Sequence, residues 1–279
     1  MATNDLGRIR SNIQGLNILS TLREVNTAVG THQLRLGTGR RINTAADDPA
    51  GMSIATKLDN RNRILTAVYD NIGQAKNMLA VAEGGLLSIN DTLVLLSEKV
   101  VASASDTLDD DDRRAISTQL VAMVAELSDI AEQTSFGGTS LLNQTKTLRF
   151  QTGESTTLTF VTRQYDAASL GLTSLLKLTP DSVINNTNYS VFIAEIAAAL
   201  KTVSTGLTDI GSLTNRLTMK EASILQAQSN TEAAYSRIRN ADMAKEQLEL
   251  TKMQILQQTA TLMLSQANSN AQSILTLFR

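Results

Sequence analysis

The chain has 279 residues and a formal net charge of −2, and 42% of it is hydrophobic although aromatic residues make up only 3%. Its apolar residues are mostly Leu, Ile, Val, Met and Ala, which favours long helices packed along seams over the aromatic-rich core of a compact enzyme. The chain has no cysteine, so a disulfide framework is excluded. With a single histidine, His32, it also has few of the usual ligands for a metal or cofactor site.

Charge is distributed unevenly along the chain. Residues 1–43 carry a net +4 and residues 237–279 a net +2, which leaves −8 in the middle. The basic side chains are scattered and lack aromatic stacking partners, so we expect no nucleic-acid binding. The first residues lack the apolar core of a signal peptide, and no run of 18 apolar residues occurs, so we expect neither a cleaved signal nor a membrane span.

The N-terminal segment predicts an amphipathic helix with one slip in its register. Gly37 and Gly39 predict its end, because glycine commonly follows the last helical residue. Its apolar residues recur at spacings of three and four: Leu6, Ile9, Ile13, Leu16, then Ile18, Leu22, Val25, Val29.

A polar stretch, residues 34–58, lies between two apolar-periodic segments and could be a catalytic or anion-binding site or a joint between two rods. Asp48 is placed to cap the next helix, and Pro49 fits its first turn, where no amide donor is needed. We therefore interpret residues 40–47 as an extended joint.

The charges of this joint are predicted to act between subunits and not on a substrate. We assign Arg40, Arg41, Asp47 and Asp48 to a subunit interface, with the two arginines contacting carboxylates of a neighbouring copy. The alternative, that the arginines are only solvated, stays open.

The strongest periodic signal predicts one long helix from residue 54 to residue 100. Steps of four and three alternate over more than six heptads, and only Arg61 is not apolar. A helix of about 50 residues is roughly 75 Å long, which predicts an elongated molecule. The seam consists of Ile54, Leu58, Arg61, Leu65, Val68, Ile72, Ala75, Leu79, Ala82, Leu86, Ile89, Leu93, Leu96 and Val100.

Two further segments carry the same alternation and are predicted to be the partners of this rod. Between the rod and the first partner, four consecutive aspartates, residues 109–112, are interpreted as charges opposing the positive end of a helix dipole. A calcium site is the less favoured reading, because the spaced ligands and glycine of a calcium loop are missing. The partner seams are Ile116, Leu120, Met123, Leu127, Ile130 and Ile193, Ile196, Leu200, Val203, Leu207, Ile210, Thr214, Leu217.

Residues 135–190 differ in kind, because glycine, threonine and alternating apolar residues replace the heptads. Leu148 and Phe150, followed by Leu158 and Phe160 beyond a glycine, predict a β-hairpin. Pro180 and the asparagines that follow it mark a loop before the next helix.

The C-terminal segment carries two apolar seams on one predicted helix. Because a lone helix can satisfy only one seam by pairing with the opposite terminus, the second seam predicts neighbours from other chains. One seam is Ala241, Leu248, Ile255 and Leu262, and the other is Met253, Ala260, Ala267 and Ile274. We assign Leu248, Ile255, Leu262 and Ile274 to the subunit interface.

Several motifs resemble those of bacterial flagellins, in the same order along the chain. They are RINTAADDPAGMSIATKL (41–58), AEGGLLSINDTLVLLSEKVVASAS (82–105), IAEQTSFGGTSLLN (130–143) and the segment from YSRIRNADMAKEQ onwards (235–279).

The resemblance implies a mainly α fold, an elongated antiparallel helical bundle or coiled coil with a small β-hairpin, in which the terminal helices pair as an inner domain. The expected domains are residues 1–46 and 237–279 for the inner pair and 47–236 for the outer rod. The hairpin would lie near 138–165 and a short loop at 165–190, where the variable outer domains of the family would be missing.

The implied function is structural: copies polymerise into the extracellular flagellar filament for motility, after export without a cleaved signal. A flagellar export chaperone and a filament cap are implied partners, and no cofactor or catalytic residue is implied. At positions that face an animal Toll-like receptor in the family, this chain has Leu95, Lys99 and Gln119, which depart from the usual residues and predict a poor agonist.

Two other readings stay open at this point. A hook–filament junction protein shares the terminal helices but commonly has a larger middle, and a flagellin-like surface adhesin would need an exposed outer domain. An enzyme is not predicted, since no nucleophile–base arrangement or phosphate loop is present.

Overall fold

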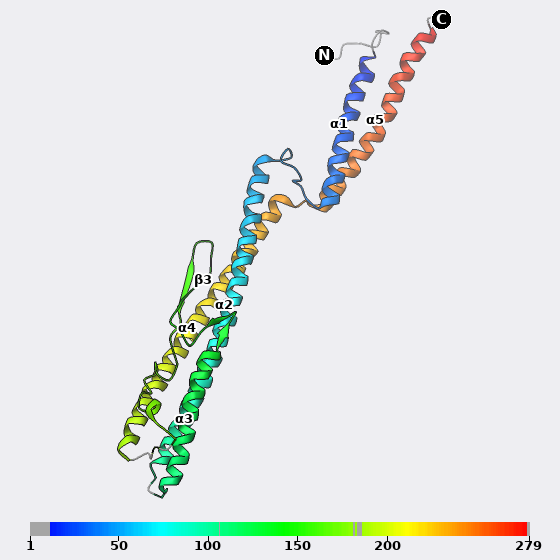
Figure 1. Ribbon diagram of the computed structural model, residues 1–279. Coiled ribbons are helices and arrows are strands. Elements are labelled where there is room, and N and C mark those ends of the chain that lie inside the picture. Colours follow the sequence, from blue (N-terminus) through cyan, green and yellow to red (C-terminus); the bar gives the residue numbers. More distant parts are fainter. Residues whose placement is uncertain (1–11, 106, 181, 183–185, 278–279) are drawn as a thin grey trace. The chain divides into compact units, whose positions relative to one another are not determined.

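The computed structural model describes residues 12–105, 107–180, 182 and 186–277, with the predicted seam residues Leu6 and Ile9 lying outside them. Helices dominate: α1 Ile13–Thr38, α2 Pro49–Ser103, α3 Asp110–Gln133, α4 Asn186–Arg239 and α5 Met243–Leu277. Four short strands and a 3-10 turn lie between α3 and α4: β1 Ser135–Phe136, β2 Thr139–Ser140, β3 Thr147–Gln151, β4 Thr157–Val161 and η1 Leu175–Lys177 (Figure 1). The mainly α fold with a small hairpin is thus confirmed.

The chain divides into two compact units, each formed by segments that are distant in sequence. Unit 1 comprises residues 1–62 and 230–279, and unit 2 comprises residues 63–229. The domain boundaries expected at residues 46/47 and 236/237 stay a prediction.

Unit 2 has a continuous apolar core formed by α2, α3, α4 and the segments between α3 and α4. Lys76 Nζ lies 2.7 Å from Glu221 Oε2, and Gln228 Nε2 donates to Thr66 Oγ1 at 3.1 Å. The contacting residue of α4 has a lower number where the residue of α2 has a higher one, so α2 and α4 run antiparallel along this core.

The predicted heptad seam of α2 is confirmed from Leu65 to Val100, where every apolar position of the seam is buried. Its start is wrong: Ile54 is 49% exposed, and Ala55 is buried instead. The reason is local, because Gly51 lies against the Ile42 side chain, which turns the 51/55 face of the helix inward and Ile54 outward.

The seams of α3 and α4 are centred beside the predicted ones. The fully buried line of α4 includes Ile196, Val203, Ile210 and Leu217 from the prediction, whereas Ile193, Leu200 and Leu207 flank it and are partly buried. On α3 the buried line is Ser117, Leu120, Val124, Leu127 and Ala131. Because a helix repeats every 3.6 residues, apolar residues spaced by three and four form a face wider than a single line. The neighbouring helices decide which line of that face is buried most deeply.

The acidic run before α3 acts as the sequence predicted. Asp109 Oδ1 accepts the Asp112 amide at 2.8 Å and caps the helix, and the three aspartates of the first turn lie at its positive end. The predicted hairpin is also confirmed, with Leu148 paired to Phe160 and Phe150 to Leu158.

Two further features of unit 2 were either not predicted or differ from the prediction. The β1–β2 turn consists of Gly137 and Gly138, both with positive φ, as a two-residue hairpin turn of this type requires. The segment after β4, expected to be a short loop, packs into the core through Tyr165, Leu172 and Leu175.

Candidate functional site

The candidate site of this protein lies in unit 1, where α1 and α5 pack along their length (Figure 1). α1 contributes Val25 to the contact, while α5 contributes Leu250 and Ala267, all three nearly inaccessible to solvent. Met253 and Ala260 are half-buried on the same face of α5. One of the two seams predicted for the C-terminal segment is therefore the contact with α1.

The other predicted seam of α5 points away from α1. Leu248 is 65% exposed, Ile255 58% and Leu262 72%. The neighbouring Leu256 and Met263 are also exposed, so this face presents a continuous run of large apolar side chains to solvent. The fourth predicted interface residue, Ile274, has a side chain that lies outside the described residues.

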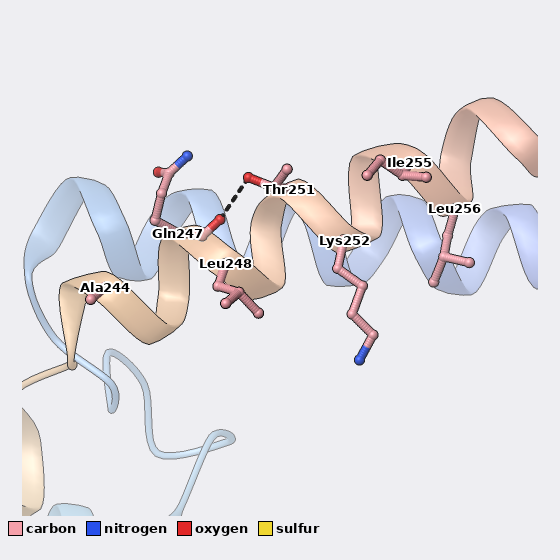
Figure 2. A pocket seen from close by; sticks show the side chains of 7 residues that line it. All are labelled: Ala244, Gln247, Leu248, Thr251, Lys252, Ile255 and Leu256. Carbon is pink, nitrogen blue, oxygen red and sulfur yellow. Dashed lines mark hydrogen bonds between the residues drawn. The ribbon is translucent and has the colours of Figure 1, made fainter.

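The N-terminal part of this apolar run forms an open groove of about 560 Å³. The Thr251 hydroxyl donates to the Gln247 carbonyl at 2.9 Å within the helix, so this polar group needs no outside partner (Figure 2). The groove is lined by Ala244, Gln247, Leu248, Thr251, Lys252, Ile255 and Leu256.

Polar contacts join α1 and α5 at three levels. Glu246 Oε2 lies 2.5 Å from His32 Nδ1, and Glu246 Oε1 lies 3.5 Å from Arg35 Nη1. Midway along the pair, Gln257 Nε2 donates to Asn26 Oδ1 at 2.7 Å. At the far end, Asn12 Nδ2 donates to the Ala267 carbonyl at 3.3 Å.

The segment after α1 connects it to α2 and contacts the segment between α4 and α5. Contrary to the expectation, it is not extended throughout, because residues 45–47 form a turn in which the Asp47 amide donates to the Thr44 carbonyl at 3.2 Å. Gly39 has a φ of 68° and ends α1, while Gly37 lies inside the helix and so does not contribute to its end. The Ala241 amide donates to the Gly39 carbonyl at 2.9 Å, and the Arg41 amide donates to the Arg239 carbonyl at 2.7 Å.

The predicted cap of α2 is present. The helix begins at Pro49, and Asp48 Oδ1 accepts the Gly51 amide at 2.9 Å. Asp47 folds the joint itself, because its Oδ2 accepts the Thr44 and Asn43 amides at 2.8 and 3.0 Å. These donors hold the pKa of the Asp47 carboxyl below its ordinary value.

The four charged residues assigned to a subunit interface differ in their contacts within the chain. Arg41 Nη2 donates to the Ile238 carbonyl at 2.8 Å and lies 3.9 Å from Asp48 Oδ2. Arg40 is exposed. Sequence reasoning missed the intrachain contacts of Arg41 and Asp47, since no local pattern reveals that residues 40 and 240 become neighbours.

The three receptor positions lie in unit 2, on α2 and α3. Leu95 and Gln119 are exposed, and Lys99 is half-buried. In the part of the chain that the structure describes, no group of three or more His, Cys, Asp or Glu side chains is arranged to hold a metal ion.

Two described helices are long and apolar enough to cross a membrane by length and composition alone, namely Pro49–Ser103 and Asn188–Arg239. This is weak support for a span, because core helices of soluble proteins pass the same test. Both helices contribute residues to the buried core of unit 2.

Comparison with known proteins gives matches over both ends of the chain. Residues 9–147 match the bacterial flagellin N-terminal helical region, and residues 193–278 match the bacterial flagellin C-terminal helical region. A flagellar filament 33 kDa core protein of Treponema phagedenis is 32% identical, covering 97% of this chain and 99% of that protein. A flagellin of Bacillus subtilis strain 168 is 31% identical, covering 98% of this chain and 100% of that protein.

A solved structure from Vibrio parahaemolyticus, assigned to the flagellar hook-associated proteins, is similar in fold. It covers 70% of this chain and 100% of that chain with a TM-score of 0.59, but the sequences are only 15% identical. That likeness concerns the fold alone and does not favour a junction role over a filament role.

Proposed function

This chain belongs to the bacterial flagellin family, whose members are structural subunits of the flagellar filament. We propose that the exposed apolar face of α5 formed by Leu248, Ile255 and Leu262, here called the α5 stripe, is a contact between subunits of that filament. The single observation that carries the proposal is the exposure of Leu248, Ile255 and Leu262 on the face of α5 opposite to α1. The family is one of structural proteins, and no catalytic role is proposed.

Energetics support an apolar partner for this stripe. Burying one exposed Leu or Ile side chain contributes about 1.5–3 kcal/mol, so three of them supply a large share of a stable contact. Residues 253–278 contain no charged side chain, so a partner helix would meet no unpaired charge over this length. The groove beside Ile255 is open and is lined by α5 alone, so a partner helix can reach this face.

The joint is proposed as a second contact. Arg40 is exposed and is free to contact a carboxylate of another copy, whereas Arg41 would combine an intersubunit contact with its bond to the Ile238 carbonyl. Asp47 and Asp48 would act in assembly through the shape of the joint, because both accept backbone amides within the chain.

Membership of the flagellin family supports two proposals, one about the export of the chain and one about the proteins that bind it. We propose that the chain is secreted to the extracellular filament without a cleaved signal peptide, and that an export chaperone and a filament cap bind it on the way. The junction-protein and adhesin alternatives lack a supporting observation, since the relatives covering nearly the whole chain are flagellins and filament core proteins.

The receptor positions are proposed to make this flagellin a poor agonist of the Toll-like receptor. Leu95 places an apolar side chain on the exposed face of α2, where it offers no charge to a receptor. Purified monomer should give a weak receptor signal, and Leu95→Arg, which introduces the residue usual at this position in the family, should raise it. Strong signalling by the unaltered chain at low concentration would contradict the proposal.

Electron microscopy of the purified chain tests the filament role directly. We expect the unaltered protein and Ile255→Leu, which keeps the apolar area, to form long helical filaments. Ile255→Asp should stay folded, because the side chain is largely exposed in the single chain, but should not polymerise. Normal filaments from Ile255→Asp would exclude the stripe as a contact, and only rings or monomers from the unaltered chain would exclude the filament role.

A further inference from the structure

Glu246 is a buried charge in the contact between α1 and α5. Among the residues that the structure describes, it is the only buried residue that carries a charge. Its two carboxylate oxygens face different partners, His32 and Arg35, which lie one turn apart on α1. Glu246 belongs to the first turn of α5 and Arg35 to the last turn of α1, where each charge also opposes the dipole of its own helix.

The apolar contact of α1 with α5 does not by itself select one alignment of the two helices. Its residues recur at heptad spacing on both sides, so a slip by seven residues still places apolar side chains opposite one another. The apolar residues facing the contact are Ile18, Leu22, Val25 and Val29 on α1, and Leu250, Met253, Ala260, Leu264 and Ala267 on α5.

A slip by one heptad in either direction leaves a charge without a partner. In one direction Glu246 comes opposite Val25, seven residues before His32 and among the most buried positions of α1. In the other direction Glu246 passes beyond the end of α1, and His32 and Arg35 face Met253. An ionised group without a partner at a buried position is strongly unfavourable, whereas a fully paired one is tolerated.

The remaining polar contacts near the two helices distinguish the native alignment from a slipped one less strongly than Glu246 does. The Asn26–Gln257 pair is exposed. The backbone bonds of the joint, from Ala241 to Gly39 and from Arg41 to Arg239, lie at half-buried or exposed residues. The bond from Asn12 to the Ala267 carbonyl is partly buried. Neutral groups that water reaches can exchange these bonds for bonds to water, so breaking one in a slipped alignment costs less than leaving the buried Glu246 carboxylate unpaired. We propose that Glu246, held by His32 and Arg35, is the positioning residue that fixes the register of α1 on α5.

The register matters for every residue on the outer face of α5. A slip of seven residues moves Leu248, Ile255 and Leu262 by about 10 Å along α1. The inference does not depend on polymerisation, because it concerns the pairing of two helices within one chain.

Distance measurement between two spin labels on the full-length chain tests the register. The chain has no cysteine, so Asn17→Cys and Thr251→Cys provide two unique attachment sites, both exposed and staggered along the pair. We expect one distance in the labelled parent. Glu246→Gln, which can still hydrogen-bond to His32 and Arg35, should keep that distance.

An apolar triple variant, His32→Leu with Arg35→Leu and Glu246→Leu, separates register from stability, because it leaves no unpaired charge. We expect the helices to remain paired but to show a second distance that reflects a shift of about 10 Å along the axis. Glu249→Leu is the matched control, since that carboxylate pairs with Lys252 on the same helix, and it should keep one distance.

Three results would overturn the proposal: a triple variant with only the parental distance, a parent without a single distance, or a Glu249→Leu control that also gains a second one.

Discussion

Gly206 of α4 lies against the hydroxyl end of the Tyr165 side chain, and a β-carbon at position 206 would overlap the Tyr165 hydroxyl. Tyr165 is buried there, and this burial raises the pKa of its hydroxyl above the ordinary value. The contact attaches the segment after β4 to α4, so a helix that would otherwise favour alanine keeps a glycine.

Gly206→Ala should destabilise unit 2 by about 1–3 kcal/mol, because the added methyl group forces Tyr165 out of its position. Gly211→Ala is the control, since a β-carbon there meets nothing within 4 Å and should stabilise the helix by about 0.5–1 kcal/mol. Urea unfolding of the two variants measures the difference. Equal stabilities would show that the segment carrying Tyr165 moves aside without cost.

Asp48→Ala should cost about 1 kcal/mol of stability, because the Gly51 amide loses its acceptor at the start of α2. The weak pair with Arg41 adds little, since both side chains are well exposed and 3.9 Å apart. Thermal unfolding of Asp48→Ala and Asp48→Asn gives the comparison, and Asn, which also caps helices, should retain most of the stability. A loss as large in Asp48→Asn would assign the effect to charge instead of capping.

Asp47 should make the joint sensitive to acid. Its pKa is lowered in the folded chain, first by the Thr44 amide and then by the Asn43 amide. A depressed pKa gives stability that is present above the unfolded value, about 4, and is lost as pH falls through the folded value. Hydrogen exchange of residues 43 and 44 between pH 5 and pH 2 should show protection falling with acid, and Asp47→Asn should remove this pH dependence. An unchanged profile in Asp47→Asn would rule out this carboxylate as the cause.

Arg41→Glu should impair assembly while the single chain stays folded. The substitution removes the bond to the Ile238 carbonyl and places a carboxylate near Asp48, both at the well-exposed joint. Circular dichroism of the monomer and the yield of sedimented filaments measure the two effects, with Arg41→Lys as the control that keeps the charge. A normal filament yield from Arg41→Glu would refute an assembly role.

Deletion of residues 240–279 should leave a folded unit 2 that cannot polymerise. The apolar core of unit 2 contains no residue from the deleted segment, whereas α1 loses its partner. Circular dichroism and negative-stain microscopy of the truncated chain test this. Filaments from it would show that α5 is dispensable for subunit contacts.

The sequence determined the features that depend on neighbours along the chain. The heptad seam of α2 from Leu65 to Val100, the hairpin pairing Leu148 with Phe160, the cap at Asp48 and the acidic start of α3 all follow from local sequence patterns. The motifs that resemble those of flagellins can also be identified from the sequence, because each is a stretch of consecutive residues.

Tertiary structure alone decided which of two equivalent apolar faces of α5 packs on α1 and which stays exposed. Periodicity assigns Leu248 and Met253 to different seams but cannot say which seam has a partner in the same chain. It also could not foresee that Arg41 meets the Ile238 carbonyl or that Glu246 meets His32. Those contacts join residues about 200 positions apart, and only the three-dimensional pairing of the two chain ends brings them together.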